Sequence, residues 1–160
     1  MFNITAPTAP GTYNFQWRMI QDGVQRFGDA TSNKQIVVVS RSNNAQFVTQ
    51  SGPGIMFATE SYTMSITMRN IGNTIWTAGA GYKLGSQNPH DNMIWGLNRV
   101  IVPHDVWPGQ EVTFTFEVMA PVKTGNTNFQ WRMVQENVEW FGDFTTNKVI
   151  AVKPHPCPDC

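Results

Sequence analysis

The stretch Asn128-Phe129-Gln130-Trp131-Arg132-Met133 decides the fold, and it occurs twice in this chain of 160 residues, first as Asn14-Phe15-Gln16-Trp17-Arg18-Met19. Hydrophobic and polar residues alternate strictly in both copies. Such alternation is typical of a β-strand with one face in a core and the other in water. We therefore expect the aromatic and methionine side chains of each copy to share the dry face of a strand.

The repeat extends well beyond these six residues. Residues 2–39 align without a gap on residues 116–153, and 20 of the 38 positions are identical. Solenoid units are about 20–50 residues long, whereas an immunoglobulin-type domain has about 100, which is close to the offset of this repeat. We expect a complete domain over 45–153. The other segments are then the last third of a preceding copy (1–39), a linker (40–44) and a Pro/Cys tail (154–160).

The same alternation marks two further strands, Ser61–Arg69 and Glu111–Val118. Shorter strands are expected at residues 46–49, 82–84, 94–102 and 149–152. Turn signals rich in Gly, Pro and Asn separate these segments, and no window shows apolar residues at helical spacing. The sequence therefore predicts an all-β fold, an immunoglobulin-like antiparallel β-sandwich of about seven to nine short strands.

Charge and hydropathy exclude several classes of partner. The chain carries 11 Lys+Arg and 11 Asp+Glu, and only 14% of its residues are charged, against about 25% in a typical domain. Nucleic acids and anionic membranes attract clustered Lys and Arg, so we expect neither as a partner. No apolar run approaches the 18 residues of a membrane span, and the first residues lack the pattern of a secretion signal.

Both cysteines, Cys157 and Cys160, lie in the tail, so we expect no disulfide within the body of the fold. With His155 they resemble half of a zinc site, but a structural zinc ion needs four ligands. Free thiols, a local or intermolecular disulfide, or a metal shared with a partner all fit this spacing. We expect no bound metal and no cofactor.

A set of short motifs in a fixed order identifies a family resemblance. These motifs are Asn70–Trp76, Gly81–Leu84, Trp95–Val100, Pro108-Gly109, Ala120-Pro121, Trp131–Met133 and Phe141-Gly142. Their order resembles the four-tryptophan (FW) domain, an immunoglobulin-like domain of a eukaryotic selective-autophagy receptor and of multidomain bacterial proteins. The bacterial form is the more similar one. The receptor form usually has a tryptophan before its Arg/Lys-Asn pair, where this chain has Thr67-Met68-Arg69-Asn70.

The resemblance implies an interaction module without a catalytic motif. We expect a non-catalytic binding or spacer module from a tandem-repeat bacterial protein, located outside the cell or at its surface. Its partner would be a protein or a glycan. Candidate ligand-binding residues are Trp107, Trp140, Phe144 and Tyr82, because Trp140 and Phe144 replace Arg26 and Ala30 of the partial copy and make one loop more aromatic.

The partial copy suggests a second function, self-assembly. Its strands lack the upstream strands that would cover them, so Phe15, Trp17, Met19 and Phe27 are expected to be exposed and to drive association. Strand exchange between copies of the chain would bury them, and would make the chain larger than a monomer in solution.

A small hydrolase is the third hypothesis, with a site built from His104, Asp105 and the loop of Trp107. His90-Asp91 is a similar pair. Neither pair is accompanied by a Gly-x-Ser-x-Gly elbow or a His-Glu-x-x-His helix, and neighbouring residues of a strand point apart. We therefore expect no catalytic residues.

Overall fold

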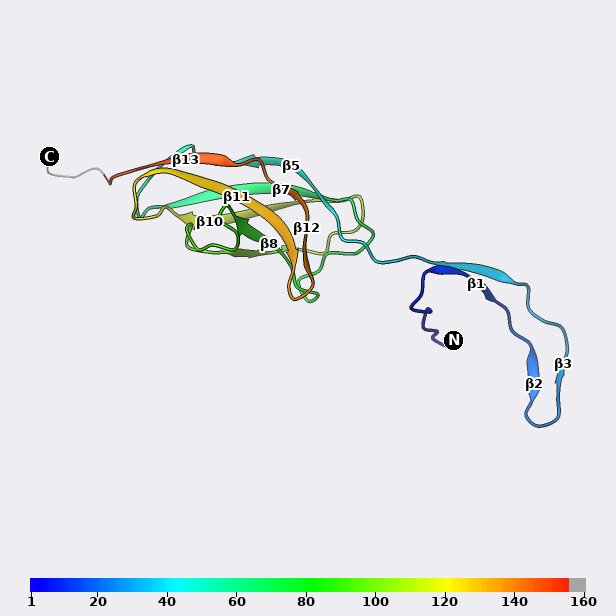
Figure 1. Cartoon of the computed structure of the whole chain (residues 1–160). Coiled ribbons are helices and arrows are strands. Elements are labelled where there is room, and N and C mark those ends of the chain that lie inside the picture. The colour runs from blue at the N-terminus through cyan, green and yellow to red at the C-terminus, as the bar shows by residue number, and fades with distance from the viewer. Residues whose placement is uncertain (156–160) are drawn as a thin grey trace. The chain divides into compact units, whose positions relative to one another are not determined.

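The computed structural model describes residues 1–155, and all their regular structure is β (Figure 1). The chain separates into two compact units, Met1–Arg41 and Ser42–Cys160. Within the described residues, no helix is long and apolar enough to cross a membrane.

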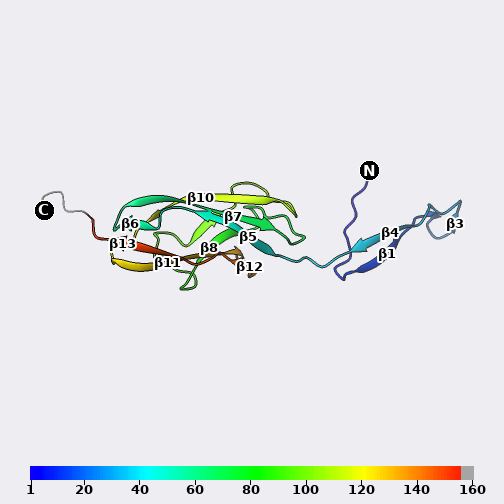
Figure 2. The same cartoon turned by 90° about the horizontal axis from the view of Figure 1, so that it is seen from above.

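The second unit is a sandwich of two sheets. Its strands are β5 (Ala45–Ser51), β6 (Ile55–Phe57), β7 (Ser61–Asn70), β8 (Tyr82–Gln87), β9 (Arg99–Ile101), β10 (Glu111–Met119), β11 (Gly125–Gln135), β12 (Glu139–Phe144) and β13 (Lys148–Lys153). One sheet has the order β10-β7-β5 and the other the order β6-β13-β11-β8-β9, with β12 beside β11. Seen from above, β10 and β11 lie on opposite sides of the sandwich (Figure 2).

The alternating segments form the core as expected. In β10 every second residue, from Val112 to Val118, is buried, and the residues between them are exposed. The opposite sheet contributes Phe129, Trp131 and Met133 from β11, all fully buried. The prediction of an all-β immunoglobulin-like sandwich is confirmed.

One strand pair departs from the antiparallel pattern. β6 pairs in parallel with β13, with Ile55 opposite Ala151. The chain leaves β5 in one sheet and enters the other through Gly52-Pro53-Gly54. Because this connection crosses between the sheets and does not form a hairpin, it carries no requirement for an antiparallel neighbour. The other strand pairs of the sandwich are antiparallel, as expected, so this pair is an exception.

Asn43, within the expected linker at 40–44, is hydrogen-bonded to the sandwich. The Asn43 side chain donates to Oε1 of Gln135 (2.8 Å) and of Glu139 (2.9 Å). Its Oδ1 accepts hydrogen bonds from the hydroxyls of Thr74 (2.6 Å) and Tyr82 (2.8 Å). Residue 43 is therefore bound to the sandwich.

The first unit contains four short strands, β1 (Gly11–Phe15), β2 (Met19–Gln21), β3 (Gln25–Phe27) and β4 (Lys34–Val38). They form two separate two-stranded sheets, β1-β4 and β2-β3. Their register, with Gly11 opposite Val38 and Met19 opposite Phe27, is that of β11 with β13 and β12 at the offset of the repeat. The first unit therefore has the strand pairing of the last third of the sandwich.

Hydrogen bonds repeat as well as register. The Trp17 N–H donates to Oγ1 of Thr31 (3.0 Å), and the Trp131 N–H to Oγ1 of Thr145 (2.9 Å). Arg18 Nε donates to the carbonyl oxygen of Gly28 (2.9 Å), as Arg132 Nε does to that of Gly142 (3.0 Å). These local structures form in both units, although none of residues 1–41 is buried.

Candidate functional site

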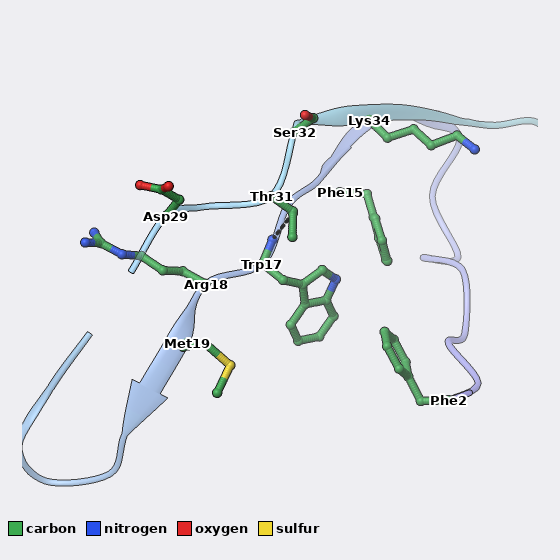
Figure 3. Close-up of a pocket in the computed structure, with 9 residues that line it drawn as sticks. All are labelled: Phe2, Phe15, Trp17, Arg18, Met19, Asp29, Thr31, Ser32 and Lys34. Carbon is green, nitrogen blue, oxygen red and sulfur yellow. Dashed lines mark hydrogen bonds between the residues drawn. The ribbon is translucent and has the colours of Figure 1, made fainter. Parts of the chain in front are cut away.

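The first unit contains an open, largely apolar groove of about 820 Å³. It is lined by Phe2, Phe15, Trp17, Arg18, Met19, Asp29, Thr31, Ser32 and Lys34. The rings of Phe2, Phe15 and Trp17 gather on one side of the strands (Figure 3). Trp17 meets both phenylalanines edge-on, with ring centroids 5.6 Å from Phe2 and 5.9 Å from Phe15. We call this surface the open face.

The apolar residues of the open face have equivalents in the core of the complete copy: Phe116, Phe129, Trp131 and Met133. The side chain of Trp17 is 54% exposed and that of Met19 64%, whereas Trp131 and Met133 are fully buried. The two units share the local sequence and hydrogen bonds, so the difference comes from the strands that pack against them. The structure brings Phe15, Trp17 and Met19 of the expected assembly residues together, while Phe27 is exposed on β3 and does not line the groove.

The first unit also has free strand edges. In the sandwich, β11 pairs with β8 through Trp131 opposite Ser86 and Met133 opposite Leu84. The equivalent residues of the first unit, 16–21, have no such neighbour, because both sheets of this unit contain only two strands. Unpaired edges present N–H and C=O groups to which another strand can bind.

The expected aromatic ligand site does not assemble as a whole. Tyr82 is only 3% exposed and packs against Trp76 and Phe141 in the core, so its ring offers no binding surface. Trp107 is exposed beside the Pro108-Gly109 turn, which follows the bridge between Trp76 and Val106. Trp140 and Phe144 lie in β12 and belong to a different part of the sandwich. Sequence reasoning had no means of separating these residues, since it depended on residue type alone.

Two of the three aromatic residues of β12, Trp140 and Phe144, lie against arginines. The Arg132 guanidinium lies 4.5 Å from the ring centroid of Phe144, which is half exposed. The Arg99 guanidinium lies 4.8 Å from that of Trp140, and the His90 ring is 4.6 Å from the same indole. Trp140 is thus packed between two side chains and against Gly85, where a Cβ would lie 2.4 Å from its ring.

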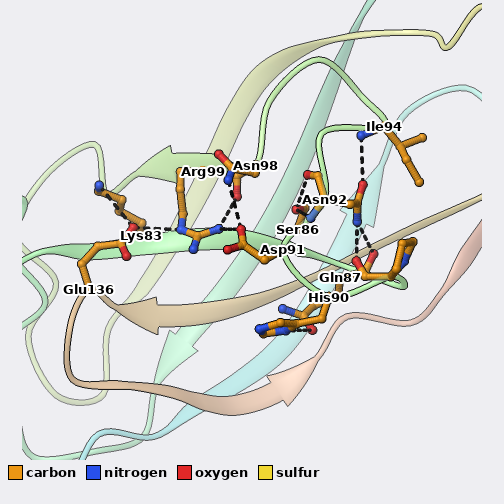
Figure 4. Close-up of polar contacts among 11 residues, drawn as sticks. Lys83, Ser86, Gln87, His90, Asp91, Asn92, Ile94, Asn98, Arg99 and Glu136 are labelled. Carbon is orange, nitrogen blue, oxygen red and sulfur yellow. Dashed lines mark hydrogen bonds and ion pairs between the residues drawn. The ribbon is translucent and has the colours of Figure 1, made fainter.

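Arg99 of β9 is the centre of a polar cluster with residues of β8, of the loop after β8 and of the turn between β11 and β12 (Figure 4). Its Nε donates to Oε1 of Glu136 (2.8 Å), and its Nη1 donates to Oδ1 of Asp91. Lys83 Nζ lies 3.3 Å from the same Glu136 oxygen. The hydrogen bond from Arg99 lowers the pKa of Asp91. Burial raises the pKa of Glu136, but hydrogen bonds from Arg99 and Lys83 outweigh it, so this pKa is also lowered.

This cluster was missed by sequence reasoning, which considered only the neighbours His90 and Asp91. The carboxylates of Asp91 and Glu136 are paired with the cations of the cluster, an arrangement that suits a structural role. Arg99 also holds the ring of Trp140 in place. Nδ1 of His90 lies 3.1 Å from Oε1 of Gln87. Arg99 was the only hint of this cluster in the sequence, because an arginine in a predicted strand needs a polar partner. Its spacing from Asp91 and Glu136 does not show that the three residues are neighbours.

The other proposed reactive groups are solvent-exposed. Nδ1 of His104 lies 3.0 Å from the carbonyl oxygen of Asp105, its own neighbour in the chain. Among the described residues, no group of three or more His, Cys, Asp or Glu side chains is arranged to hold a metal ion. Cys157 and Cys160 lie outside the described residues.

Comparison with known proteins identifies a family over the sandwich. Residues 54–150 match the model of the family described as the Ig-like domain from next to BRCA1 gene. One similar solved structure is the CARDB domain of PF1109 from Pyrococcus furiosus, determined by NMR. It has 13% sequence identity and a TM-score of 0.47, and the match covers 70% of this chain and 94% of that one. The comparison with curated proteins found no match.

Proposed function

Because the chain belongs to the family of the Ig-like domain from next to BRCA1 gene, we propose that it is a non-catalytic binding module that acts through protein–protein contact at the open face. One observation carries this proposal: Phe15, Trp17 and Met19 line an open groove, while their equivalents in the same chain are core residues. A surface with the composition and strand pairing of a domain core is suited to protein contact.

The energy of this surface favours association. Burying one large apolar side chain contributes about 1.5–3 kcal/mol relative to leaving it in water. On the open face two or three such residues lie side by side, next to unpaired strand edges. Burying them together contributes more free energy than burying one isolated surface residue. Copies of the chain should therefore associate when nothing else covers the open face.

A protein partner fits the chain better than a glycan. Glycan binding by stacking needs exposed aromatic rings, and of the four residues considered for it Tyr82 is buried and Trp140 is packed by Arg99 and His90. The remaining two, Trp107 and Phe144, come from different elements.

The finer parts of the proposal concern origin and location. We assign the chain to the bacterial FW form, a tandem-repeat protein outside the cell or at its surface. The support is the ordered set of motifs, whose tryptophans Trp76, Trp95 and Trp131 all lie in the core, and the low fraction of charged residues.

Solution mass tests the binding surface directly. The 160-residue chain should be larger than a monomer by light scattering at micromolar concentration, and deletion of residues 1–41 should return it to a monomer. Trp17→Ser combined with Met19→Ser should do the same, because both side chains are exposed and their loss leaves the sandwich intact.

A matched variant distinguishes association through the open face from non-specific association through any exposed tryptophan. Trp107→Ser removes another exposed tryptophan, from the sandwich, and should leave the association unchanged. A chain that stays monomeric at high micromolar concentration would overturn the proposal.

A further inference from the structure

We propose that the open face binds one kind of occupant: a segment with the strand pattern of residues 45–115, the first two thirds of an immunoglobulin-like domain of this family. The inference rests on the proposed function and names the partner of the same surface. Residues 2–39 would then become the last third of a second closed sandwich.

The complete copy shows what covers this face. In the sandwich, Phe116 meets Trp131 edge-on at 5.0 Å, and Trp95 meets Phe129 at 5.7 Å. β8 pairs along β11, and β6 pairs along β13. Phe15 and Trp17 present the same two rings as Phe129 and Trp131, and β1, which ends at Phe15, pairs with β4 in the register of β11 with β13. A segment that supplies the equivalents of β6, β8 and Trp95 therefore fits the open face without a change in its backbone pairing.

Three polar residues of the first unit are equivalent to residues that hydrogen-bond to the first two thirds of the domain in the sandwich. In the sandwich the carbonyl oxygen of Asn128 accepts a hydrogen bond from Nε1 of Trp95 (2.9 Å), and Oδ2 of Asp143 accepts one from the N–H of Phe47 (3.1 Å). Nζ of Lys148 donates to the carbonyl oxygen of Gly52 (2.5 Å). The first unit has the same residue types at the equivalent positions, Asn14, Asp29 and Lys34.

A glycine gives independent support. Gly142 has a φ of +72°, and a Cβ there would lie 2.5 Å from Cβ and the carbonyl oxygen of Ala45. Gly28 has nearly the same φ, +73°, but nothing lies within 4 Å of its Cβ position. Gly28 therefore leaves room for a strand equivalent to β5, as Gly142 does in the sandwich. The first unit contains no such strand.

The position of Phe2 indicates which end of the occupant would lie beside it. Phe2 is equivalent to Phe116, and its edge-on contact with Trp17 at 5.6 Å matches the contact of Phe116 with Trp131. Phe116 follows Thr115 within the continuous strand β10. The end of the occupant that is equivalent to Thr115 would therefore lie beside Phe2 when the occupant is bound.

Identical copies of this chain cannot supply the occupant in full. Each chain has two segments of the last-third type, 2–39 and 116–153, and one segment of the type 45–115. Exchange of strands among any number of copies therefore leaves one open face per chain. Strand exchange between identical chains, as the sequence analysis expected, moves the open face from one segment to another and does not remove it.

The test adds the occupant to the full chain. A fusion places a second copy of residues 42–115 directly before Phe2, so that Thr115 is followed by Phe2. We expect a monomer in which backbone amides of residues 11–38 exchange with solvent more than ~100-fold slower than in the 160-residue chain, since they now lie in a closed sandwich. Exchange that stays as fast as in the 160-residue chain would overturn the proposal.

Two matched variants make the result specific. Trp17→Ser should unfold the new sandwich in the fusion, while in the 160-residue chain it should leave the melting temperature unchanged. Insertion of one serine between Thr115 and Phe2 turns Phe2 to the opposite face of its strand and should abolish the protection of residues 11–38. Equal protection with and without the insertion would contradict the proposed register.

If the fusion is insoluble, the 160-residue chain is labelled with ¹⁵N and refolded together with unlabelled residues 42–115. A one-to-one complex, with the amide signals of residues 11–38 moved toward those of 125–152, supports the proposal. Unchanged signals contradict it. The proposed function is judged separately, because the association of the 160-residue chain and its loss in the Trp17→Ser, Met19→Ser variant involve no added segment.

Discussion

At the scale of single residues, Trp17 and Trp131 are a matched pair within one molecule. They share six residues of sequence and the same hydrogen bond to a threonine, but one is 54% exposed and the other fully buried. Residue type and neighbours along the chain are therefore held constant, and only tertiary packing differs.

Trp131→Ala should lower the free energy of unfolding of the sandwich by about 3–5 kcal/mol, because it removes a buried aromatic side chain and leaves a cavity. Trp17→Ala is the control and should change this free energy by less than about 0.5 kcal/mol. Urea unfolding followed by circular dichroism measures both. Similar values for the two variants would mean that Trp131 does not hold the core.

Arg99→Gln tests the polar cluster. Since Arg99 lowers the pKa of Asp91 and Glu136, its loss should raise both, as measured by NMR titration of the carboxyl groups. A lowered carboxyl pKa stabilises the folded state above the ordinary value of about 4, and this contribution is lost as the pH falls through the folded-state pKa. The free energy of unfolding of the variant should therefore fall less than that of the parent as the pH is lowered from neutral to acidic values. Arg69→Gln, on the other sheet, should leave both pKa values where they are.

At the scale of elements, the approach of β5 to β12 depends on one backbone position. Gly142→Ala combines a positive φ with a Cβ 2.5 Å from Ala45, so it should cost about 3 kcal/mol or more through strain and overpacking. Gly28→Ala has the same φ without the contact, and should leave the unfolding of the sandwich unchanged. Chemical denaturation of both variants measures the difference, and equal effects would contradict the close approach of these strands.

Element boundaries also mark what the sequence could predict. The alternation in Ser61–Arg69 and Glu111–Val118 indicated β7 and β10 almost to the residue. The expected strand at 94–102 is a strand only at Arg99–Ile101, because Trp95 and Gly96 lie in turns that direct the indole to the carbonyl oxygen of Asn128. Apolar residues in such a loop have the composition of a strand without its periodicity.

At the scale of the whole molecule, the two units differ in what stabilises them. The sandwich has a closed core, while the first unit has only local pairing and no buried residue. Deletion of residues 1–41 should therefore leave the main thermal transition within about 2 °C of the parent, measured by calorimetry at a concentration where both are monomeric. A large decrease would show that the sandwich needs the first unit.

The sequence by itself determined the all-β class, the repeat, the dry faces of the long strands and the local hydrogen bonds that both copies share, because these depend on alternation and on neighbours along the chain. Only the tertiary structure decided the parallel pairing of β6 with β13, the burial of Tyr82 and the cluster around Arg99. It also decided that Trp131 is a core residue while Trp17 lines an open groove. Burial depends on which distant strands pack against a face, and identical local sequences carry no information about that.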